Sequence, residues 1–413
     1  MRRRIAIVAS HPIQYHAHWY RELARAEDLD LEVLYCHEAT QRDQAESGFG
    51  VDFAWDIPLL EGYRYRFLKN AARRPGVSKF GGMDSPELRG IIIHERYDAV
   101  VVSGWHTKSY WQAILACREC GTPVMVRSDS HLHDDRSTLM RLAKWTPYHY
   151  FISRFDACLA AGTWSREYFL HYGAKPERVF IVPHCVPKQP AGAPDAQQLQ
   201  TAREAARRQW DIPRGATVFL FAGKFIARKR PLDFIRAVAT AATGNPAVYG
   251  LMAGDGPMRA EAEALTAGLR APITFAGFLN QRAIQPAYAA SDILVLPSDQ
   301  DTWGLVVNEA MIHGRACIVS DRAGCGPDLI VGCEPDPINA GCETDLINED
   351  ARTGFIFPTG DVDALAGYMV RIADTPGMAE RMGAEAARLI GGHSAAAAVS
   401  GLREAVAAIM ENG

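Results

Sequence analysis

Apolar runs of strand length alternate with amphipathic stretches along the first half of the chain. The apolar runs predict buried strands at residues 5–9, 31–35, 99–103, 124–127, 157–161 and 179–182. Apolar positions at helical spacing predict helices at residues 19–25, 109–118 and 164–172. Strands that alternate with helices of this length are typical of a parallel sheet with helices on both faces.

Two segments depart from this alternation. Residues 39–90 are rich in Arg, Gly and aromatic side chains, and we expect irregular, functional loops there. Residues 187–213 contain several prolines around a predicted helix at residues 196–210. Such a composition is typical of a hinge between two domains.

The alternation restarts after the hinge. Strands are predicted at residues 217–222, 249–253, 273–276, 293–296, 316–320 and 354–357. Helices are predicted at residues 231–242, 258–267, 284–290, 306–312, 364–373, 378–390 and 395–410. The expected architecture is α/β, with two doubly wound, Rossmann-like domains facing across a cleft, and ligands bound at the carboxyl ends of the strands.

Length and composition agree with two globular domains. The chain has 413 residues, 48% hydrophobic content and a net charge of -4, so we expect no nucleic-acid partner. Residues 2–4 are all Arg, which allows at most peripheral contact with an anionic membrane surface. Neither a membrane span nor a signal peptide is predicted, and the expected location is the cytoplasm.

The nine cysteines are scattered along the chain, which favours reduced thiols over a disulfide framework. Cys117 and Cys120 form a C-x-x-C on a predicted helix, and no second pair lies nearby to complete a metal site. A short degenerate repeat places Cys325, Cys333 and Cys342 after glycines. A Gly-rich loop with buried or free thiols is favoured there, and a thiolate metal cluster is the alternative.

The segment at residues 299–311 carries the strongest chemical signal. It follows a predicted buried strand and opens a helix through Gly304, with Asp301 and Glu309 on either side of the helix start. A helix N-terminus offers free N–H groups and partial positive charge, which suit a diphosphate. Flanking acids suit the hydroxyl groups on either side of it, as in a sugar nucleotide. Asp299 and Asp301 also form a D-x-D, but we favour this explanation over a metal site.

Further motifs follow other strands of the second half. The loop at residues 223–230 contains Lys224 and Lys229 with interleaved arginines, and cations there would stabilise a leaving diphosphate. The turn at residues 254–257 reads Gly-Asp-Gly-Pro, for which a structural role is favoured. Phe278 follows a glycine at a strand end, where backbone amides could contact a base or simply form a turn.

As a set, these motifs resemble the retaining GT-B glycosyltransferases of family four. The matching residues occur in the family's order: Gly223 and Lys229, Gly254 to Pro257, Gly277 and Phe278, Asp301 to Gly314, Gly324 to Leu329, and Thr353 to Phe355. The resemblance is strong over residues 150–390 and weaker before. It implies an acceptor-binding domain at residues 1–186, a linker at 187–213 and a donor-binding domain at 214–390. The helix at residues 391–413 would return to the N-terminal domain.

The resemblance also implies roles for individual residues. Glu309 would hold the ribose hydroxyls, Asp301 the donor sugar, and Lys229 with Lys224 the diphosphate. Gly223, Phe278 and the backbone of Trp303, Gly304 and Leu305 would complete the donor site. The expected donor is a nucleoside-diphosphate sugar, UDP in preference to GDP, and the acceptor a hydroxyl group of a saccharide, lipid or small molecule. No metal or other cofactor is expected.

The chain departs from the family pattern at three places. Asp301 stands where the family usually has Glu, and Lys224 where it usually has Arg. The usual glycine pair of the first loop is replaced by residues 10–16, Ser-His-Pro-Ile-Gln-Tyr-His. Residues 331–352 resemble an insertion beside the donor site.

Histidines that follow N-terminal strands are the candidates for the acceptor side. The family has a His near residues 128–133, against the donor sugar, and His131 is the first choice with His133 second. His106 is a further candidate. His11, Gln14 and His16 lie at the end of the first strand, where an acceptor would bind.

The mechanism that fits these residues has no enzymic nucleophile. The diphosphate leaves, the acceptor hydroxyl attacks the same face, and a phosphate oxygen takes its proton. The alternatives are a sugar-nucleotide epimerase or hydrolase on the same fold, and a non-catalytic sugar-nucleotide binder. A dinucleotide oxidoreductase is disfavoured because no G-x-G-x-x-G follows the first strand.

Overall fold

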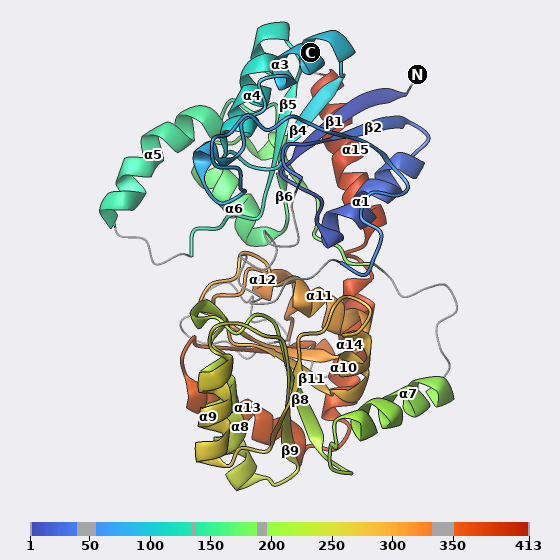
Figure 1. The fold of residues 1–413 in the computed structure, drawn as a ribbon, viewed down its shortest axis with the longest axis vertical. Helices are drawn as coiled ribbons and strands as arrows, with labels where there is room; N and C mark the ends of the chain where they lie inside the picture. The colour runs from blue at the N-terminus through green and yellow to red at the C-terminus, as the bar shows by residue number, and fades with distance from the viewer. Residues whose placement is uncertain (1, 39–54, 134–137, 188–195, 333–350, 412–413) are drawn as a thin grey trace. The chain divides into compact units, whose positions relative to one another are not determined.

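The structure is a computed structural model, and it describes residues 2–38, 55–133, 138–187, 196–332 and 351–411. The chain divides into two compact units (Figure 1). Unit 1 comprises Met1–Asp43, Pro58–Pro187 and His393–Gly413, and unit 2 comprises Gln44–Ile57 and Lys188–Gly392. Most of the inserted segment at 331–352 lies outside the described residues, together with Cys333 and Cys342.

Unit 1 is built on a parallel sheet. Within the described residues it has seven strands in the order β3-β2-β1-β4-β5-β6-β7, and every adjacent pair is parallel. The strands are β1 (Arg3–Ala9), β2 (Leu29–Tyr35), β3 (Arg64–Phe67), β4 (Ala99–Val102), β5 (Val124–Ser128), β6 (Ala157–Ala160) and β7 (Val179–Ile181).

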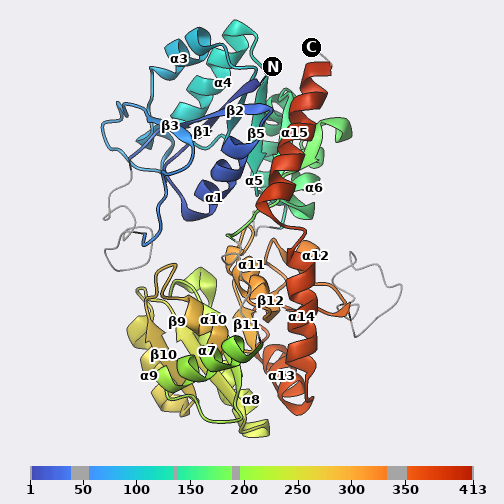
Figure 2. The same ribbon diagram turned by 90° about the vertical axis from the view of Figure 1, so that its right-hand side faces the viewer.

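Helices cover both faces of this sheet. They are α1 (Gln14–Arg25), α3 (Leu88–Glu95), α4 (Lys108–Cys120), α5 (Thr138–Ile152), α6 (Thr163–His171) and α15 (Ala395–Glu411). The last of these, α15, packs against α1, β6 and β7 (Figure 2). Gly401 makes the close approach possible, since a Cβ there would lie 2.0 Å from the carbonyl oxygen of Ile181.

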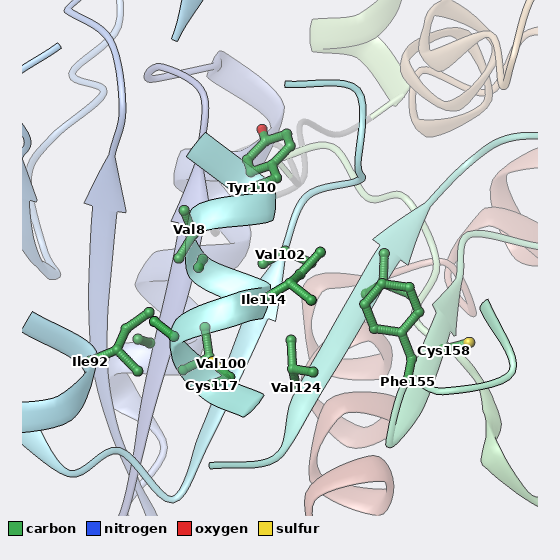
Figure 3. Packing of buried hydrophobic residues seen from close by; sticks show 14 of the residues in the cluster. Val8, Ile92, Val100, Val102, Tyr110, Ile114, Cys117, Val124, Phe155 and Cys158 are labelled. Atoms are coloured by element: carbon green, nitrogen blue, oxygen red, sulfur yellow. The ribbon is translucent and has the colours of Figure 1, made fainter. Parts of the chain in front are cut away.

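The core of unit 1 lies on the two faces of the sheet. Val8, Val100 and Val102 pack on one face beneath α4, together with Ile114 (Figure 3). Alternate residues of the same strands, such as Ile7, pack on the other face. This follows from the two-residue period of a strand, and it explains why the strands appear in the sequence as continuous apolar runs.

Unit 2 has a second parallel sheet, with six strands in its described part in the order β10-β9-β8-β11-β12-β13. The strands are β8 (Thr217–Ala222), β9 (Val248–Ala253), β10 (Ile273–Gly277), β11 (Ile293–Leu296), β12 (Ala316–Ser320) and β13 (Gly354–Phe357). The strand order reverses between β8 and β11, which is the place where open α/β sheets bind ligands.

Helices again surround the sheet: α7 (Ala196–Gln209), α8 (Pro231–Gly244), α9 (Arg259–Leu269), α10 (Gln285–Ala290), α11 (Leu305–Ile312), α12 (Gly326–Leu329), α13 (Val362–Asp374) and α14 (Met378–Ile390). The helix expected within the linker, α7, packs on α10 in unit 2. Arg207 fixes it there, because its guanidinium bonds the Ala290 carbonyl at 2.9 Å and the Asp292 carboxylate at 2.8 Å.

The predicted fold class, two Rossmann-like α/β domains with parallel sheets, is confirmed. Among the described strands and α-helices, four were not predicted: β3 in the segment expected to be irregular, α3 at its end, α5, and the short α12. The first helix also begins five residues earlier than the predicted residue 19, at Gln14. None of the helices in the described part of the chain has both the length and the apolar character that crossing a bilayer requires.

Candidate functional site

Three loops of unit 2 meet at the carboxyl edge of its sheet, because β8, β11 and β12 are neighbours. We call them the unit-2 loop cluster: residues 223–230, 297–304 and 321–325. Backbone hydrogen bonds join them: the Asp299 N–H donates to the Arg228 carbonyl at 2.8 Å, and the Gly324 N–H donates to the Asp301 carbonyl at 2.9 Å. The family motifs that lie far apart in the sequence therefore form one framework.

Lys229 and Asp301 are in direct contact within this cluster. The Lys229 ammonium forms an ion pair with the Asp301 carboxylate, and the Ser298 hydroxyl lies 3.4 Å from the same oxygen. Both charged side chains are mostly buried, with 17% and 15% of their surface exposed. The structure thus brings together two of the residues chosen from the sequence, and each holds the other in place.

Lys224 lies beside the same pair and experiences a different environment. Burial, and then the positive charges of Arg228 and Lys229, lower the pKa of Lys224 to about 8. Lys224, Arg228 and Lys229 repel each other, so an anion bound among these three cations would relieve both the repulsion and the lost hydration. Gly223 precedes them, and the space where its Cβ would lie is open.

The N-terminus of α11 opens beside this loop. Gly304 has φ 96°, a left-handed conformation that favours glycine, and a Cβ there would lie 2.7 Å from the Leu296 side chain. Leu305 then starts the helix, whose first turn contains no acid. The N–H groups of such a first turn are available to an anion.

Trp303 contributes to the site through its backbone rather than its side chain. The indole is buried, and its N–H donates to the Asn308 side-chain oxygen at 2.8 Å. This contact ties the loop to the second turn of α11. The Cys325 N–H also donates to the Trp303 carbonyl at 2.9 Å, so the loop is held from both sides.

Glu309 is held by two side chains that sequence reasoning missed. The Tyr288 hydroxyl donates to one carboxylate oxygen at 2.6 Å, and the Gln281 amide lies 3.3 Å from the other. Tyr288 in turn stacks on His313, with 4.8 Å between the ring centroids. Burial lowers the pKa of His313, so this ring is neutral at pH 7. The carboxylate therefore has a fixed position and orientation on α11, one turn after the helix begins.

The two glycine turns are parts of the same framework. A Cβ at Gly254 would lie 1.9 Å from the carbonyl oxygen of Gly223, so the Gly-Asp-Gly-Pro turn packs directly beneath the basic loop. The Asp255 carboxylate accepts from the Gly256 N–H at 2.7 Å, which supports the structural role favoured for it. Phe278 follows Gly277, whose carbonyl accepts from the Gly254 N–H at 2.8 Å.

In unit 1, His131 and His133 come together with Trp164, another residue that sequence reasoning missed. His133 stacks on the indole with 3.9 Å between ring centroids, and His131 lies 5.4 Å from it. His131 is buried and His133 exposed. The backbone N–H of His133 donates to the His131 Nδ1 at 3.2 Å.

His16 belongs to a second group, the unit-1 polar cluster, with Arg127, Asp129 and His184. Arg127 lies over the Trp19 ring at 4.9 Å, and its guanidinium bonds the Val182 carbonyl at 3.4 Å. The His184 Nε2 lies 3.6 Å from the Asp129 carboxylate. Burial, and then the Arg127 cation, hold the pKa of His16 well below its usual range and also lower the pKa of His184.

The other acceptor-side candidates lie near this cluster, because the charge of His11 acts on His16 and that of Asp129 acts on His106. His11 is within 3.0 Å of the Ser10 hydroxyl, at the end of β1. Gln14 is buried at the start of α1. His106 packs against Tyr110 at 5.4 Å, and burial lowers its pKa.

The described cysteines, histidines and acids do not form a metal site. No group of three or more His, Cys, Asp or Glu side chains is arranged to hold a metal in the described part of the chain. Cys117 is buried in α4 while Cys120 is exposed. Cys325 is buried behind the unit-2 loop cluster, where burial raises its pKa well above the usual range.

Comparison with known proteins identifies both units. Residues 216–375 match the family described as "Glycosyl transferases group 1", and residues 12–185 match the "Glycosyl transferase 4-like domain". The first match contains the unit-2 loop cluster and Glu309. The second contains the histidines of unit 1 singled out above, apart from His11.

Curated relatives are transferases of sugars. A D-inositol 3-phosphate glycosyltransferase of Streptomyces scabiei is 29% identical over 232 residues, 54% of this chain and 46% of that protein. An alpha-D-kanosaminyltransferase of Streptomyces kanamyceticus is 25% identical over 285 residues, 67% of each chain. The matched stretch thus spans about half the length of the first of these relatives.

Solved structures share the fold. A glycosyltransferase of Rickettsia africae superposes with a TM-score of 0.71 at 16% identity, covering 100% of both chains. Sucrose-phosphate synthase of Thermosynechococcus elongatus gives 0.71 at 18% identity, also over 100% of both chains. Anabaena HepE, solved in complex with UDP and glucose, gives 0.66 at 14% identity, with 97% of this chain and 98% of that one covered. These likenesses confirm the GT-B fold, and with the two family matches they show that the chain belongs to the group 1 glycosyl transferases.

Proposed function

We propose that this protein is a retaining, metal-independent glycosyltransferase. It transfers a sugar from a nucleoside-diphosphate sugar, UDP in preference to GDP, to a hydroxyl acceptor. The observation that carries the proposal is the arrangement in unit 2: three cations and a helix N-terminus with Asp301 on one side and Glu309 on the other. The sugar-transferase relatives and the UDP bound to Anabaena HepE support it.

The diphosphate is assigned to the basic loop and the start of α11. Lys224, Lys229 and the N-terminus of α11 offer positive charge where negative charge grows as the diphosphate leaves. A bound diphosphate also competes with Asp301 for Lys229. The donor thereby loosens the ion pair and leaves the Asp301 carboxylate available to the hydroxyls of the sugar.

The ribose is assigned to Glu309. The Tyr288 hydroxyl and the Gln281 amide each donate to one of its oxygens, and a carboxylate oxygen can accept more than one hydrogen bond. Because the carboxylate is already fixed, binding loses little side-chain entropy. This arrangement favours a ribonucleotide over a deoxyribonucleotide.

The transfer step uses no covalent enzyme intermediate. The bond between the anomeric carbon and the phosphate oxygen breaks with its electron pair on the diphosphate. The acceptor oxygen forms its bond on the same face, and a phosphate oxygen takes the acceptor proton. His131 is the candidate for contact with the donor sugar. His11, Gln14, His16, His106 and His133 are the candidates for contacts with the acceptor.

A direct assay tests the proposal. The purified protein is incubated with α-linked UDP- and GDP-sugars, a panel of hydroxyl acceptors and excess EDTA, and the anomeric configuration of the product is determined by NMR. We expect an α-glycoside and an unchanged rate with EDTA. A β-glycoside, an epimer formed without acceptor, or a rate restored only by a divalent ion would contradict it.

A further inference from the structure

Helix α5 exposes an unusual amount of apolar surface. Five of its side chains are large, apolar and exposed: Leu139, Met140, Leu142, Trp145 and Tyr150. Leu139 and Leu142 are 80% and 66% exposed. The other exposed large apolar side chains of the described residues are spread over many elements, as is normal for a soluble protein. An apolar patch confined to one helix indicates a binding surface.

The apolar residues face away from the core of unit 1. Ile152 is buried in that core, and Tyr148 and Phe151 pack against it, so the second half of α5 attaches the helix to the sheet. Leu139, Leu142 and Tyr150 fall on the opposite side at helical spacing. Figure 1 shows α5 projecting with its first turns away from the rest of unit 1.

The charge of this region is entirely positive. Residues 138–154 contain Arg141, Lys144 and Arg154 and neither Asp nor Glu, although the whole chain carries a net charge of -4. The Arg154 guanidinium lies 3.6 Å from the ring centroid of the exposed Tyr150, and the Lys144 ammonium lies 5.5 Å from the ring centroid of Tyr148 on the side that packs on unit 1. Apolar and aromatic side chains on one face of a helix, with Arg and Lys on another, are typical of helices that lie in a membrane interface.

We propose that α5 docks unit 1 on the surface of an anionic lipid bilayer. Leu139, Leu142 and Trp145 would enter the boundary between headgroups and acyl chains, and the basic side chains would contact the anionic headgroups. Pairing of α5 with the α5 of a second copy fits less well. It would bring like charges together with no acid on the helix to compensate them.

The location of α5 links this surface to the proposed function without depending on it. β5 leads into the loop that carries His131 and His133, and α5 follows that loop in the chain. Docking would therefore hold the acceptor-side loop close to a lipid surface, which favours an acceptor hydroxyl carried by a lipid. Membrane binding itself is measured without any donor or acceptor.

Vesicle sedimentation of the full-length protein tests the docking. Vesicles contain roughly three parts phosphatidylcholine to one part phosphatidylglycerol, with pure phosphatidylcholine as the comparison. We expect binding to the anionic vesicles that weakens as salt is raised, and little binding to the neutral ones. The variant Leu139→Ser/Leu142→Ser should bind about tenfold or more weakly. Arg141→Glu and Lys144→Glu should each weaken binding to the anionic vesicles about fivefold or more.

The matched control is Leu115→Ser/Leu199→Ser, which removes two exposed leucines on α4 and α7. It should bind the vesicles like the wild-type protein. Three results would overturn the proposal: no binding by the wild type, equal binding by the α5 and control variants, or a dimer in analytical ultracentrifugation that the α5 variants abolish while vesicle binding persists. Transfer activity can fail in all these proteins without affecting the outcome, so the two proposals are tested separately.

Discussion

The unit-2 loop cluster and the unit-1 polar cluster lie at the same kind of place, the carboxyl ends of parallel strands, yet they hold charge differently. In unit 2, Lys229 pairs with the Asp301 carboxylate, and Lys224 is held in the same loop against the positive charges of Arg228 and Lys229. In unit 1, burial keeps His16 and His184 neutral, and Arg127 is covered by Trp19. Concentrated positive charge suits a diphosphate, whereas neutral imidazoles suit hydroxyl groups. On this difference, the proposed diphosphate site is assigned to unit 2 and the proposed hydroxyl-binding site to unit 1.

Removal of the Lys229 charge should have the largest effect. Lys229→Met should lower kcat by about 10³-fold, because the charge on the leaving diphosphate loses a fixed partner and Asp301 loses its counterion. The control is Lys229→Met/Asp301→Asn, which removes both members of the pair. If the two residues act as a unit, the double variant should lower kcat by much less than the product of the two single reductions. Strict additivity of the two effects would show that the ion pair has no functional part.

Replacement of the carboxylate proposed to bind the ribose should have the next largest effect. Glu309→Gln keeps the shape and the Tyr288 contact but removes the charge, so UDP affinity in calorimetry should fall roughly 10- to 100-fold. Tyr288→Phe keeps the stacking on His313 and removes one hydrogen bond to Glu309, so UDP affinity should fall about fivefold. Unchanged UDP affinity in Glu309→Gln would remove the assignment of Glu309.

Substitution of His131 should lower the rate of transfer without changing nucleotide binding. His131→Ala should lower kcat by about tenfold and leave the affinity for free UDP unchanged, because His131 is assigned to the sugar and not to the nucleotide. His133→Ala is the matched variant, with an exposed ring against the same Trp164. A fall in the melting temperature with full activity in His131→Ala would make that histidine structural.

The smallest effect is a dependence on pH. Lys224 has its pKa lowered to about 8 and must be charged to hold the diphosphate. UDP affinity should therefore be full below this pH and fall above it, by at most about tenfold per pH unit, because binding takes up one proton. Lys224→Arg keeps its charge in this range and should flatten the profile. An equal slope in both proteins would assign the dependence to another group.

Local pattern was enough to predict most of the fold. The apolar runs that became β1, β4 and β11 are buried on both faces, and such strands are continuous in the sequence. β3 was missed because its four residues, Arg-Tyr-Arg-Phe, form an edge strand with little apolar signal. α5 was missed because its apolar residues face outwards and its helix contains Pro147.

The candidate site was predicted only in part, for a related reason. Gly304, Asp301 and Glu309 could be read from one stretch, because the geometry of a strand, a loop and a helix is local. Tyr288 and Gln281 could not, since their contacts with Glu309 depend on α10 and the loop before it lying against α11. The Lys229–Asp301 pair likewise depends on β8 and β11 being neighbours.

The sequence by itself determined the elements, the parallel α/β class and the chemistry of single loops, because these depend on short-range periodicity and on the conformational limits of glycine and proline. Only the tertiary structure decided which charges touch, which histidines are neutral and which side chains hold Glu309. Those properties arise from strand order and burial, and both are set by contacts between residues far apart in the chain.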